Sequence, residues 1–175
     1  MKLYGYELTT LISKAKIDNR IEQIAKELSL QFKNEIPILI GVLNGAFIFM
    51  SDLMRKLTID CEMDFIKISS YAGKKSTGTV ILLKDISADI TGRHVIIVED
   101  IIDSGLTIKF LRDRLRGASA KSVTIVTLLL KPGIAKLDFK IDYIGFEIPP
   151  EFVVGYGLDY DQKLRHLPEV YRLEE

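Results

Sequence analysis

Short apolar stretches alternate with helical patterns along this chain, and that alternation constrains the fold more than any other feature. Residues 37–42, 95–98 and 122–130 are almost continuously apolar, which is typical of strands buried on both faces. Residues 17–30 and 108–115 carry apolar side chains at helical spacing instead. Strands of this kind between helices predict an α/β fold, with a mostly parallel twisted sheet flanked by helices.

Weaker patterns complete the predicted order of elements. A helix is expected after Asn44–Gly45 and runs through Lys56, while the small, polar residues 70–79 predict a mobile loop. Further strands are predicted over residues 61–69, 80–83, 143–146 and 152–156. Because no linker, repeat or low-complexity tract divides the chain, we expect a single domain spanning residues 1–175.

The predicted sheet also indicates where a ligand binds. In parallel α/β sheets, ligands lie just beyond the carboxyl ends of the strands. Four predicted loops follow strands, and if those strands are parallel neighbours the loops meet at one edge. These loops begin at Leu43, Glu99, Lys131 and Leu158.

Composition narrows the class of protein. The 24 lysines and arginines balance 24 aspartates and glutamates, so the formal net charge of zero offers no basic footprint for nucleic acid or acidic membranes. No apolar run reaches the ~20 residues of a membrane span, and the first ten residues lack a signal pattern. Cys61 is the only cysteine and is expected to be a buried structural thiol. We therefore expect a cytoplasmic protein with neither a nucleic-acid nor a membrane partner.

The strongest functional signal lies in residues 95–107, Val-Ile-Ile-Val-Glu-Asp-Ile-Ile-Asp-Ser-Gly-Leu-Thr. A buried strand is expected to end in the carboxylates of Glu99 and Asp100, and a helix to begin near Gly105. Backbone N–H groups at a helix N-terminus attract anions, and a glycine lets the backbone approach a phosphate closely. Ser104 and Thr107 add hydroxyl donors. The segment therefore predicts a phosphate site.

Two carboxylates beside a phosphate are consistent with a sugar phosphate as the ligand. Carboxylates accept hydrogen bonds from ribose hydroxyls, while backbone amides hold the phosphate and a magnesium ion would ease the repulsion. Each residue alone has a simpler reading, because the acidic pair suits a solvated strand end and Asp103 suits a helix N-cap. The whole string favours the sugar-phosphate site, since it combines separate requirements in the correct order.

Residues 95–107 resemble the phosphoribosyl-diphosphate motif of type I phosphoribosyltransferases, and their Glu-Asp-Ile-Ile-Asp core resembles the hypoxanthine-guanine branch of that family. Residues 41–46, Gly-Val-Leu-Asn-Gly-Ala, are similar to the pyrophosphate loop of that branch. Residues 69–71, Ser-Ser-Tyr, resemble the start of its flexible catalytic loop. Residues 152–160, Phe-Val-Val-Gly-Tyr-Gly-Leu-Asp-Tyr, resemble its base-binding signature.

Single positions both extend the resemblance and depart from it. Lys131 follows a buried strand, as the purine-contacting lysine of the family does, and Arg165 follows the base-binding signature at the family's spacing. Asn44 stands where many members carry lysine or arginine, and Leu106 stands where some carry lysine. These departures concern the affinity for pyrophosphate and phosphate, not the class of enzyme.

The resemblance implies a type I fold with a small hood formed by the terminal segments. It implies a purine salvage enzyme that transfers 5-phosphoribosyl from phosphoribosyl diphosphate to N9 of a 6-oxopurine and releases pyrophosphate. Hypoxanthine and guanine would give IMP and GMP. Mg²⁺ is the implied cofactor, and a homodimer or homotetramer is the implied assembly. The relative preference for hypoxanthine, guanine or xanthine stays open.

The resemblance also implies roles for individual residues. Asp103 would be the general base, taking the proton from N7 of the purine, and Glu99 and Asp100 would hold the ribose hydroxyls. The implied magnesium ligands are Asp159, Glu99 and Asp100. The implied ribose-phosphate ligands are Glu99, Asp100, Asp103, Ser104, Gly105, Leu106 and Thr107. The implied pyrophosphate ligands are Leu43, Asn44, Gly45 and Arg165. The implied purine ligands are Lys131, Phe152, Val153 and Asp159. The implied flexible loop begins with Ser70 and Tyr71.

Other interpretations of these patterns are open at this point. Phe152 and Val153 also suit ordinary core packing, and Lys131 and Arg165 also suit surface charges. A regulator that binds the ribosyl diphosphate without turnover is a second function, although it would usually need a nucleic-acid-binding part. A phosphorylated receiver domain is a third, but its acidic pair would lie early in the chain.

Overall fold

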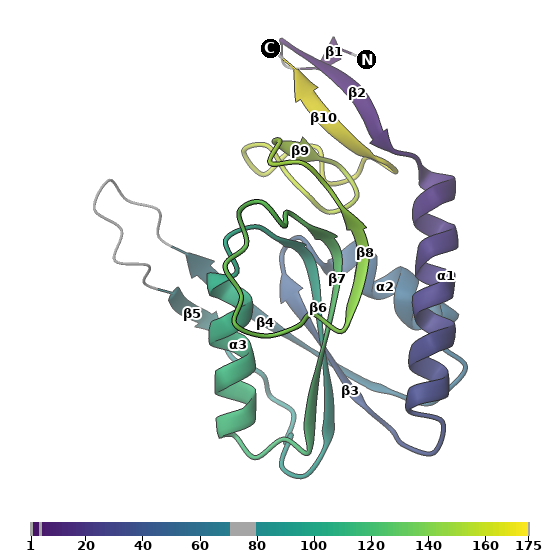
Figure 1. Ribbon diagram of the computed structural model, residues 1–175, viewed down its shortest axis with the longest axis vertical. Helices are drawn as coiled ribbons and strands as arrows, with labels where there is room; N and C mark the ends of the chain where they lie inside the picture. The colour runs from purple at the N-terminus through teal and green to yellow at the C-terminus, as the bar shows by residue number, and fades with distance from the viewer. Residues whose placement is uncertain (1, 4, 71–79, 175) are drawn as a thin grey trace.

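The computed structural model describes residues 2–3, 5–70 and 80–174, which form two sheets and three helices (Figure 1). The larger sheet has six strands in the order β5-β4-β3-β6-β7-β8. All neighbours in it are parallel except β4 and β5. Its strands are β3 (Ile38–Leu43), β4 (Glu62–Ser70), β5 (Val80–Lys84), β6 (His94–Ile102), β7 (Ser122–Leu130) and β8 (Tyr143–Glu147).

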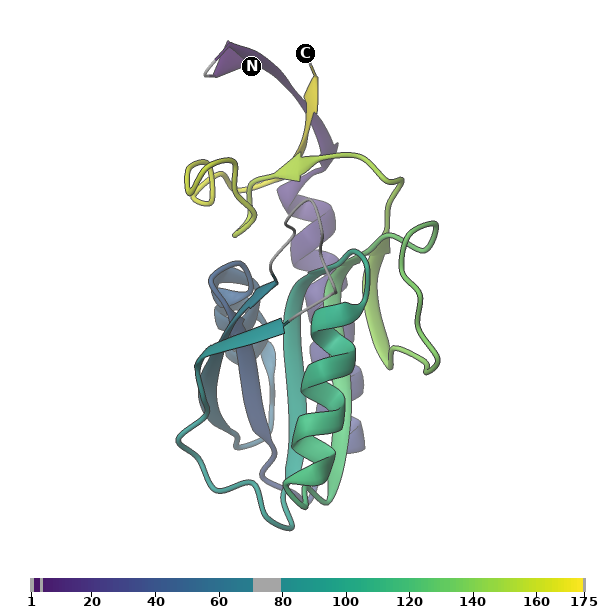
Figure 2. The same cartoon turned by 90° about the vertical axis from the view of Figure 1, so that its left-hand side faces the viewer.

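Helices cover both faces of this sheet, which explains why its central strands are apolar throughout. Helices α1 (Lys14–Gln31) and α2 (Phe47–Lys56) lie on one face, and α3 (Leu106–Gly117) lies on the other (Figure 2). Alternate residues of β6 enter the two cores, with Ile96 facing α1 and α2 and Ile97 facing α3. The apolar positions predicted for the first helix are all buried: Ile17, Ile21, Ile24, Ala25 and Leu28. The predicted α/β class is confirmed.

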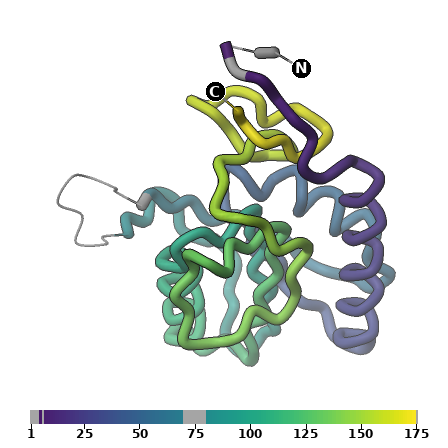
Figure 3. The backbone as a smooth tube through the Cα atoms, turned by 45° about the horizontal axis from the view of Figure 1, so that its top comes forward, coloured from purple at the N-terminus to yellow at the C-terminus, as the bar shows by residue number. Residues whose placement is uncertain are grey.

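The two ends of the chain build a second, antiparallel sheet in the order β1-β2-β10-β9. Its strands are β1 (Lys2–Leu3), β2 (Tyr6–Ile12), β9 (Val153–Val154) and β10 (Val170–Glu174). This sheet, which we call the hood, lies beyond one end of the large sheet, and the tube view places both termini on it (Figure 3). The hood of terminal segments implied by the resemblance is therefore present.

Two predicted strands differ from the observed ones by more than one residue at their carboxyl ends. Strand β6 continues through the acidic pair to Ile102, because residues 99–102 keep pairing with β7. The strand expected over 152–156 is reduced to β9, because Gly155, Tyr156 and Gly157 all have positive φ. Positive φ is incompatible with an extended strand.

Two further expectations need correction. The loop at Leu158 follows a hood strand, so three of the four predicted loops, not four, follow parallel neighbours of the large sheet. Cys61 is half-buried rather than buried, because it precedes β4 and packs only against the margin of the core on the α1 and α2 face. The predicted loop of residues 70–79 lies outside the described residues beyond Ser70, which ends β4.

Candidate active site

The candidate site lies at the carboxyl edge of the large sheet, beneath the hood (Figure 1). Strands β3, β6 and β7 are parallel neighbours, so the segments that follow them emerge side by side. These segments begin with Asn44, Asp103 and Lys131. The structure thus brings together residues that are far apart in the sequence.

The segment between β6 and α3 forms a cup of about 200 Å³. Helix α3 begins after Gly105, which has φ +87° and therefore a conformation that L side chains rarely adopt. Gly105 offers no side-chain acceptor and the Leu106 N–H makes only a long contact of 3.4 Å to Ser104 Oγ, so backbone N–H groups of the first turn can still bind an anion. The cup is lined by Glu99, Ile101, Ile102, Asp103, Ser104, Gly105, Thr107 and Ile108.

The acidic pair at the end of β6 is poorly solvated. Glu99 is 7% exposed, and its Oε2 has no hydrogen-bond partner among the described residues. Burial, with the neighbouring Asp100 carboxylate, raises the pKa of Glu99 well above its ordinary value. Burial also raises the pKa of Asp100, against a hydrogen bond from Ile101 N and the charge of Arg165. Asp100 thus has partners that favour its charged form, whereas Glu99 keeps one buried oxygen without a donor among the described residues.

The loop after β3 packs directly on this acidic pair. The peptide bond between Leu43 and Asn44 is cis, Asn44 is exposed and Gly45 is buried. A Cβ on Gly45 would overlap the Asp100 carboxylate. Only glycine fits here, so the predicted pyrophosphate loop and the predicted ribose-binding carboxylates are adjacent.

Lys131 and Asp103 meet across the same edge. The Lys131 Nζ lies 3.2 Å from Asp103 Oδ2, although Lys131 is 8% exposed and the Asp103 side chain is 53% exposed. The lysine is therefore an inward-facing charge rather than a surface charge. The carboxylate of Asp103 is open to a ligand in the cup.

The hood and the segment after β9 contribute the other residues predicted to bind the base. Phe152 is 55% exposed and contacts Tyr160 edge-to-face, with 6.1 Å between ring centroids, whereas Val153 is buried. An exposed phenylalanine is available for stacking, so the core-packing interpretation holds for Val153 alone. Arg165 NH2 lies 2.8 Å from Asp159 Oδ1, and Arg165 NH1 donates to the Gly157 carbonyl at 2.8 Å.

The structure does not assemble every predicted ligand set. Among the described residues, no three His, Cys, Asp or Glu side chains gather around one point as a metal site would require. Asp159 is paired with Arg165 and is not grouped with Glu99 and Asp100. Tyr71 lies outside the described residues.

Three residues that the sequence did not single out join the hood to this edge. Tyr156 donates a hydrogen bond to Asp52 on α2, and a Cβ on Gly157 would overlap the Gly45 carbonyl. The glycines on either side of Tyr156 were a usable signal, because paired glycines often mark positive φ or a close backbone approach. Nothing in the sequence indicates the partner on α2.

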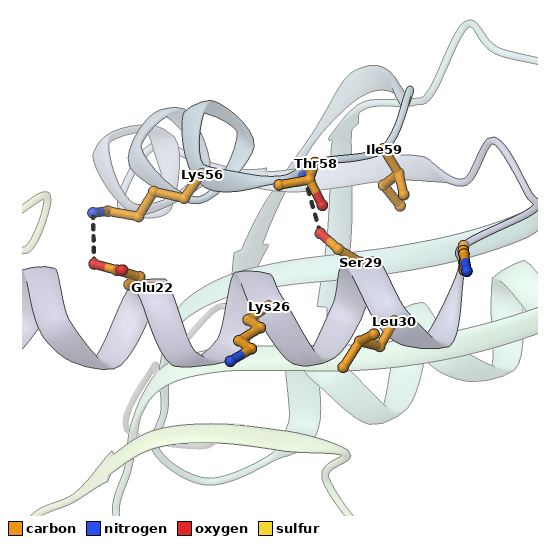
Figure 4. Close-up of a pocket in the computed structure, with 8 residues that line it drawn as sticks. Glu22, Lys26, Ser29, Leu30, Lys56, Thr58 and Ile59 are labelled. Atoms are coloured by element: carbon orange, nitrogen blue, oxygen red, sulfur yellow. Dashed lines mark hydrogen bonds and ion pairs between the residues drawn. The ribbon is translucent and has the colours of Figure 1, made fainter.

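A larger cleft of about 570 Å³ lies elsewhere, between α1 and the segment after α2 (Figure 4). Across it, Lys56 pairs with Glu22 at 3.9 Å and Thr58 N donates to Ser29 Oγ at 3.0 Å. These contacts join one helix to the segment packed on it, and the residues at the carboxyl edge do not line the cleft. The smaller cup is the better candidate because it contains Glu99 of the acidic pair and the N-terminus of α3.

Comparison with known proteins agrees with this geometry. Residues 11–161 match the family model of the phosphoribosyl transferase domain. The hypoxanthine-guanine phosphoribosyltransferase of Bacillus subtilis (strain 168) is 45% identical over 161 residues, covering 91% of this chain and 89% of that protein.

Solved structures of the same family share the fold of this chain. A hypoxanthine-guanine phosphoribosyltransferase from Bacillus anthracis has a TM-score of 0.90 and 42% identity, covering 97% of this chain and 99% of that one. The hypoxanthine phosphoribosyltransferase of Trypanosoma cruzi, solved with the product IMP, has a TM-score of 0.89 and 36% identity, covering 99% and 97%.

A helix N-terminus beside the buried Glu99 and its neighbour Asp100 suits a sugar phosphate, and the family match identifies the sugar-phosphate chemistry. The chain belongs to the phosphoribosyl transferase family. The relatives above are hypoxanthine-guanine and hypoxanthine enzymes, so the branch and the transferase activity predicted from the sequence are confirmed. None of the helices in the described part of the chain combines the length and apolarity needed to cross a membrane.

Proposed function

We propose that the chain transfers 5-phosphoribosyl from phosphoribosyl diphosphate to N9 of hypoxanthine or guanine, giving IMP or GMP and pyrophosphate. The single observation that carries this proposal is the cup, where the buried Glu99 carboxyl group and the N-terminus of α3 share one concavity. The similarity to enzymes named for these bases, one of them bound to IMP, supports the choice of purine.

The cup offers complementary groups to a ribose 5-phosphate. The backbone amides at the start of α3, with the hydroxyls of Ser104 and Thr107, would bind the phosphate. Glu99 and Asp100 would accept hydrogen bonds from the ribose hydroxyls, which gives the unpartnered Glu99 oxygen a donor. Leu106 has an exposed side chain at this turn, so its contribution would come from its backbone.

The pyrophosphate would lie on the loop after β3. Asn44 brings no positive charge to it, so the backbone of residues 43–45 and the Arg165 guanidinium would provide the donors. Arg165 suits this role because its planar group pairs with phosphate oxygens, and the guanidinium acts electrostatically on Asp100.

Mg²⁺ fits the acidic pair. The Glu99 oxygen is buried and unpartnered, and two carboxylates are enough for an ion that takes its remaining ligands from substrate oxygens and water. Glu99 and Asp100 would hold the ion, and Asp159 would join them only by leaving Arg165. When bound, Mg²⁺ would neutralise charge on the departing diphosphate.

The residues around the base would position it and accept its proton. Phe152 would stack on the purine, and the backbone of Val153 would read its edge. Asp103 would take the proton from N7 as N9 attacks, since its carboxylate is open to the cup. Ser70 and the segment after it, with Tyr71, are proposed to cover the site and exclude water.

Lys131→Met is expected to weaken the preference for oxopurines. The lysine would donate to the purine 6-oxygen, which adenine replaces with an amino group that cannot accept. Losing one charged hydrogen bond should lower kcat/KM for hypoxanthine by about 10-fold and leave that for adenine unchanged. Steady-state kinetics with both bases measure this, and an unaltered ratio would show that Lys131 does not read the 6-oxygen.

The proposed reaction is tested by incubating the protein with phosphoribosyl diphosphate, Mg²⁺ and one base at a time. Hypoxanthine, guanine, xanthine, adenine and uracil are compared by nucleotide formation. Product from hypoxanthine or guanine that disappears on chelation of Mg²⁺ is the expected result. Binding of phosphoribosyl diphosphate without product from any base would instead support the regulator. A cytoplasmic location, one domain over residues 1–175 and a homodimer or homotetramer stay predictions.

A further inference from the structure

A short coil of the hood, residues 155–157, has an unusual backbone. Its φ values are +91°, +50° and +99°, and the middle residue is Tyr156, a bulky side chain that rarely adopts this conformation. The coil is held by backbone hydrogen bonds of 2.8–3.0 Å from its three amides to the carbonyls of Leu158, Leu167 and Arg165. It is therefore a fixed part of the hood, directly after the residues proposed to bind the base.

Tyr156 reaches from this coil into the core beneath the hood. The residue is 4% exposed and belongs to the same buried cluster as Phe49 and Leu53 of α2. Its hydroxyl donates a hydrogen bond of 2.6 Å to Asp52 Oδ2, also on α2. Burial and the Asp52 carboxylate both raise the pKa of Tyr156, so the hydroxyl keeps its proton throughout the working pH range.

A second contact lies beside this hydrogen bond. The Gly157 Cα faces the Gly45 carbonyl so closely that a Cβ would overlap it, and Gly45 in turn packs on Asp100. Gly45 belongs to the loop that leads into α2, the helix that carries Asp52. The hood coil therefore touches the loop and helix at two points, one of backbone and one of side chain.

We propose that Tyr156 and Asp52 are positioning residues that couple the purine half of the site to the pyrophosphate half, so that each ligand strengthens binding of the other. This inference rests on the proposed function, because it assigns the purine to the hood and pyrophosphate to the loop after β3. A ligand on the loop after β3 immobilises Gly45. The Tyr156–Asp52 hydrogen bond keeps residues 155–157 in contact with Gly45. The coil follows Phe152 closely in the chain, and its Gly157 is hydrogen-bonded to Arg165 through both the N–H and the carbonyl group.

The coupling is measured with two ligands that do not react with each other. The Kd of hypoxanthine is determined by calorimetry with and without saturating magnesium pyrophosphate, and the Kd of pyrophosphate with and without hypoxanthine. Linkage requires the same factor from both directions, and coupled sites usually show about 5–150-fold. We expect a factor in that range for the unaltered protein and one near unity for Tyr156→Phe.

Matched variants separate this role from a general loss of stability. Tyr143→Phe removes another tyrosine hydroxyl, which donates a hydrogen bond of 2.5 Å to Gln31 Oε1. Because this bond does not involve the hood, the variant should keep the coupling factor. Asp52→Ala should lose the factor as Tyr156→Phe does, while Asp52→Asn, which keeps an acceptor oxygen, should retain most of it. The double variant of Tyr156→Phe and Asp52→Ala should lose no more than either single variant.

Three results would overturn the inference. Full coupling in Tyr156→Phe, even with a lower melting temperature, would make the hydroxyl a structural group only. If the unaltered protein converts hypoxanthine but its two Kd values do not depend on the other ligand, Tyr156 and Asp52 couple no sites. The proposed function would then stand without this inference. A protein that neither binds nor converts hypoxanthine would remove the proposed function and this inference together.

Discussion

Asp103→Asn is expected to lower kcat for phosphoribosyl transfer by about 10²–10⁴-fold, the usual contribution of a general base. Asparagine keeps the shape of the side chain and a hydrogen bond to Lys131, which lies 3.2 Å from the carboxylate, but it cannot take up the N7 proton. The KM for phosphoribosyl diphosphate should change little. Steady-state kinetics with hypoxanthine over a range of both substrates give the two quantities.

Asp113→Asn is the matched control for this prediction. Asp113 is an exposed aspartate on α3 that pairs with Arg112 at 3.5 Å, outside the residues that line the cup. The control should keep normal turnover, and both variants should keep a normal melting temperature because both side chains are mostly exposed. Near-normal kcat in Asp103→Asn would remove this residue as the base.

Glu99→Gln is expected to weaken the use of phosphoribosyl diphosphate while it stabilises the folded protein at alkaline pH. In the free protein the buried Glu99 favours its protonated form, which glutamine resembles in shape and in lack of charge. Glutamine cannot carry the negative charge that Mg²⁺ requires, so we expect kcat/KM for phosphoribosyl diphosphate to fall by about 100-fold, as loss of a strong charged interaction implies. Steady-state kinetics at saturating Mg²⁺ test the loss.

The same variant should be more stable than the unaltered protein at alkaline pH. Burial raises the folded-state pKa of Glu99 above its unfolded value of 4.5, so the folded state binds this proton more tightly. The stability gained from that proton is complete below about pH 4.5 and is lost as the pH rises through the folded-state pKa. Glutamine has no proton to lose, so the advantage of Glu99→Gln in the free energy of unfolding should grow with pH.

Thermal unfolding between pH 4 and pH 9, without ligands, measures this difference. Glu147→Gln, an exposed glutamate at the end of β8, is the control and should show no such trend. A Glu99→Gln protein whose melting temperature falls with rising pH as steeply as that of the unaltered protein would contradict the protonated state. Retained kcat/KM would contradict the role of Glu99 in binding.

Much of this fold was predictable because its signals are local. Helical spacing in α1 and nearly continuous apolar runs in β3, β6 and β7 each reflect burial of one short segment, so they can be recognised without knowing what covers it. The same holds for residues 99–107, where acidic, small and hydroxyl side chains occur in the order that a strand, a loop and a helix require. Family resemblance added the hood, for which β2 and β10 offered no clear pattern of their own.

The remainder depends on residues that meet only when the chain is folded. The contact of Gly45 with Asp100, the pairing of Lys131 with Asp103 and the hydrogen bond from Tyr156 to Asp52 each join different elements. Periodicity reports which face of an element is buried, but not which side chain of another element it meets. Residue types and their order were thus enough for the class of site, whereas the parallel order of β3, β6 and β7 and the return of the chain end as the hood decided its geometry.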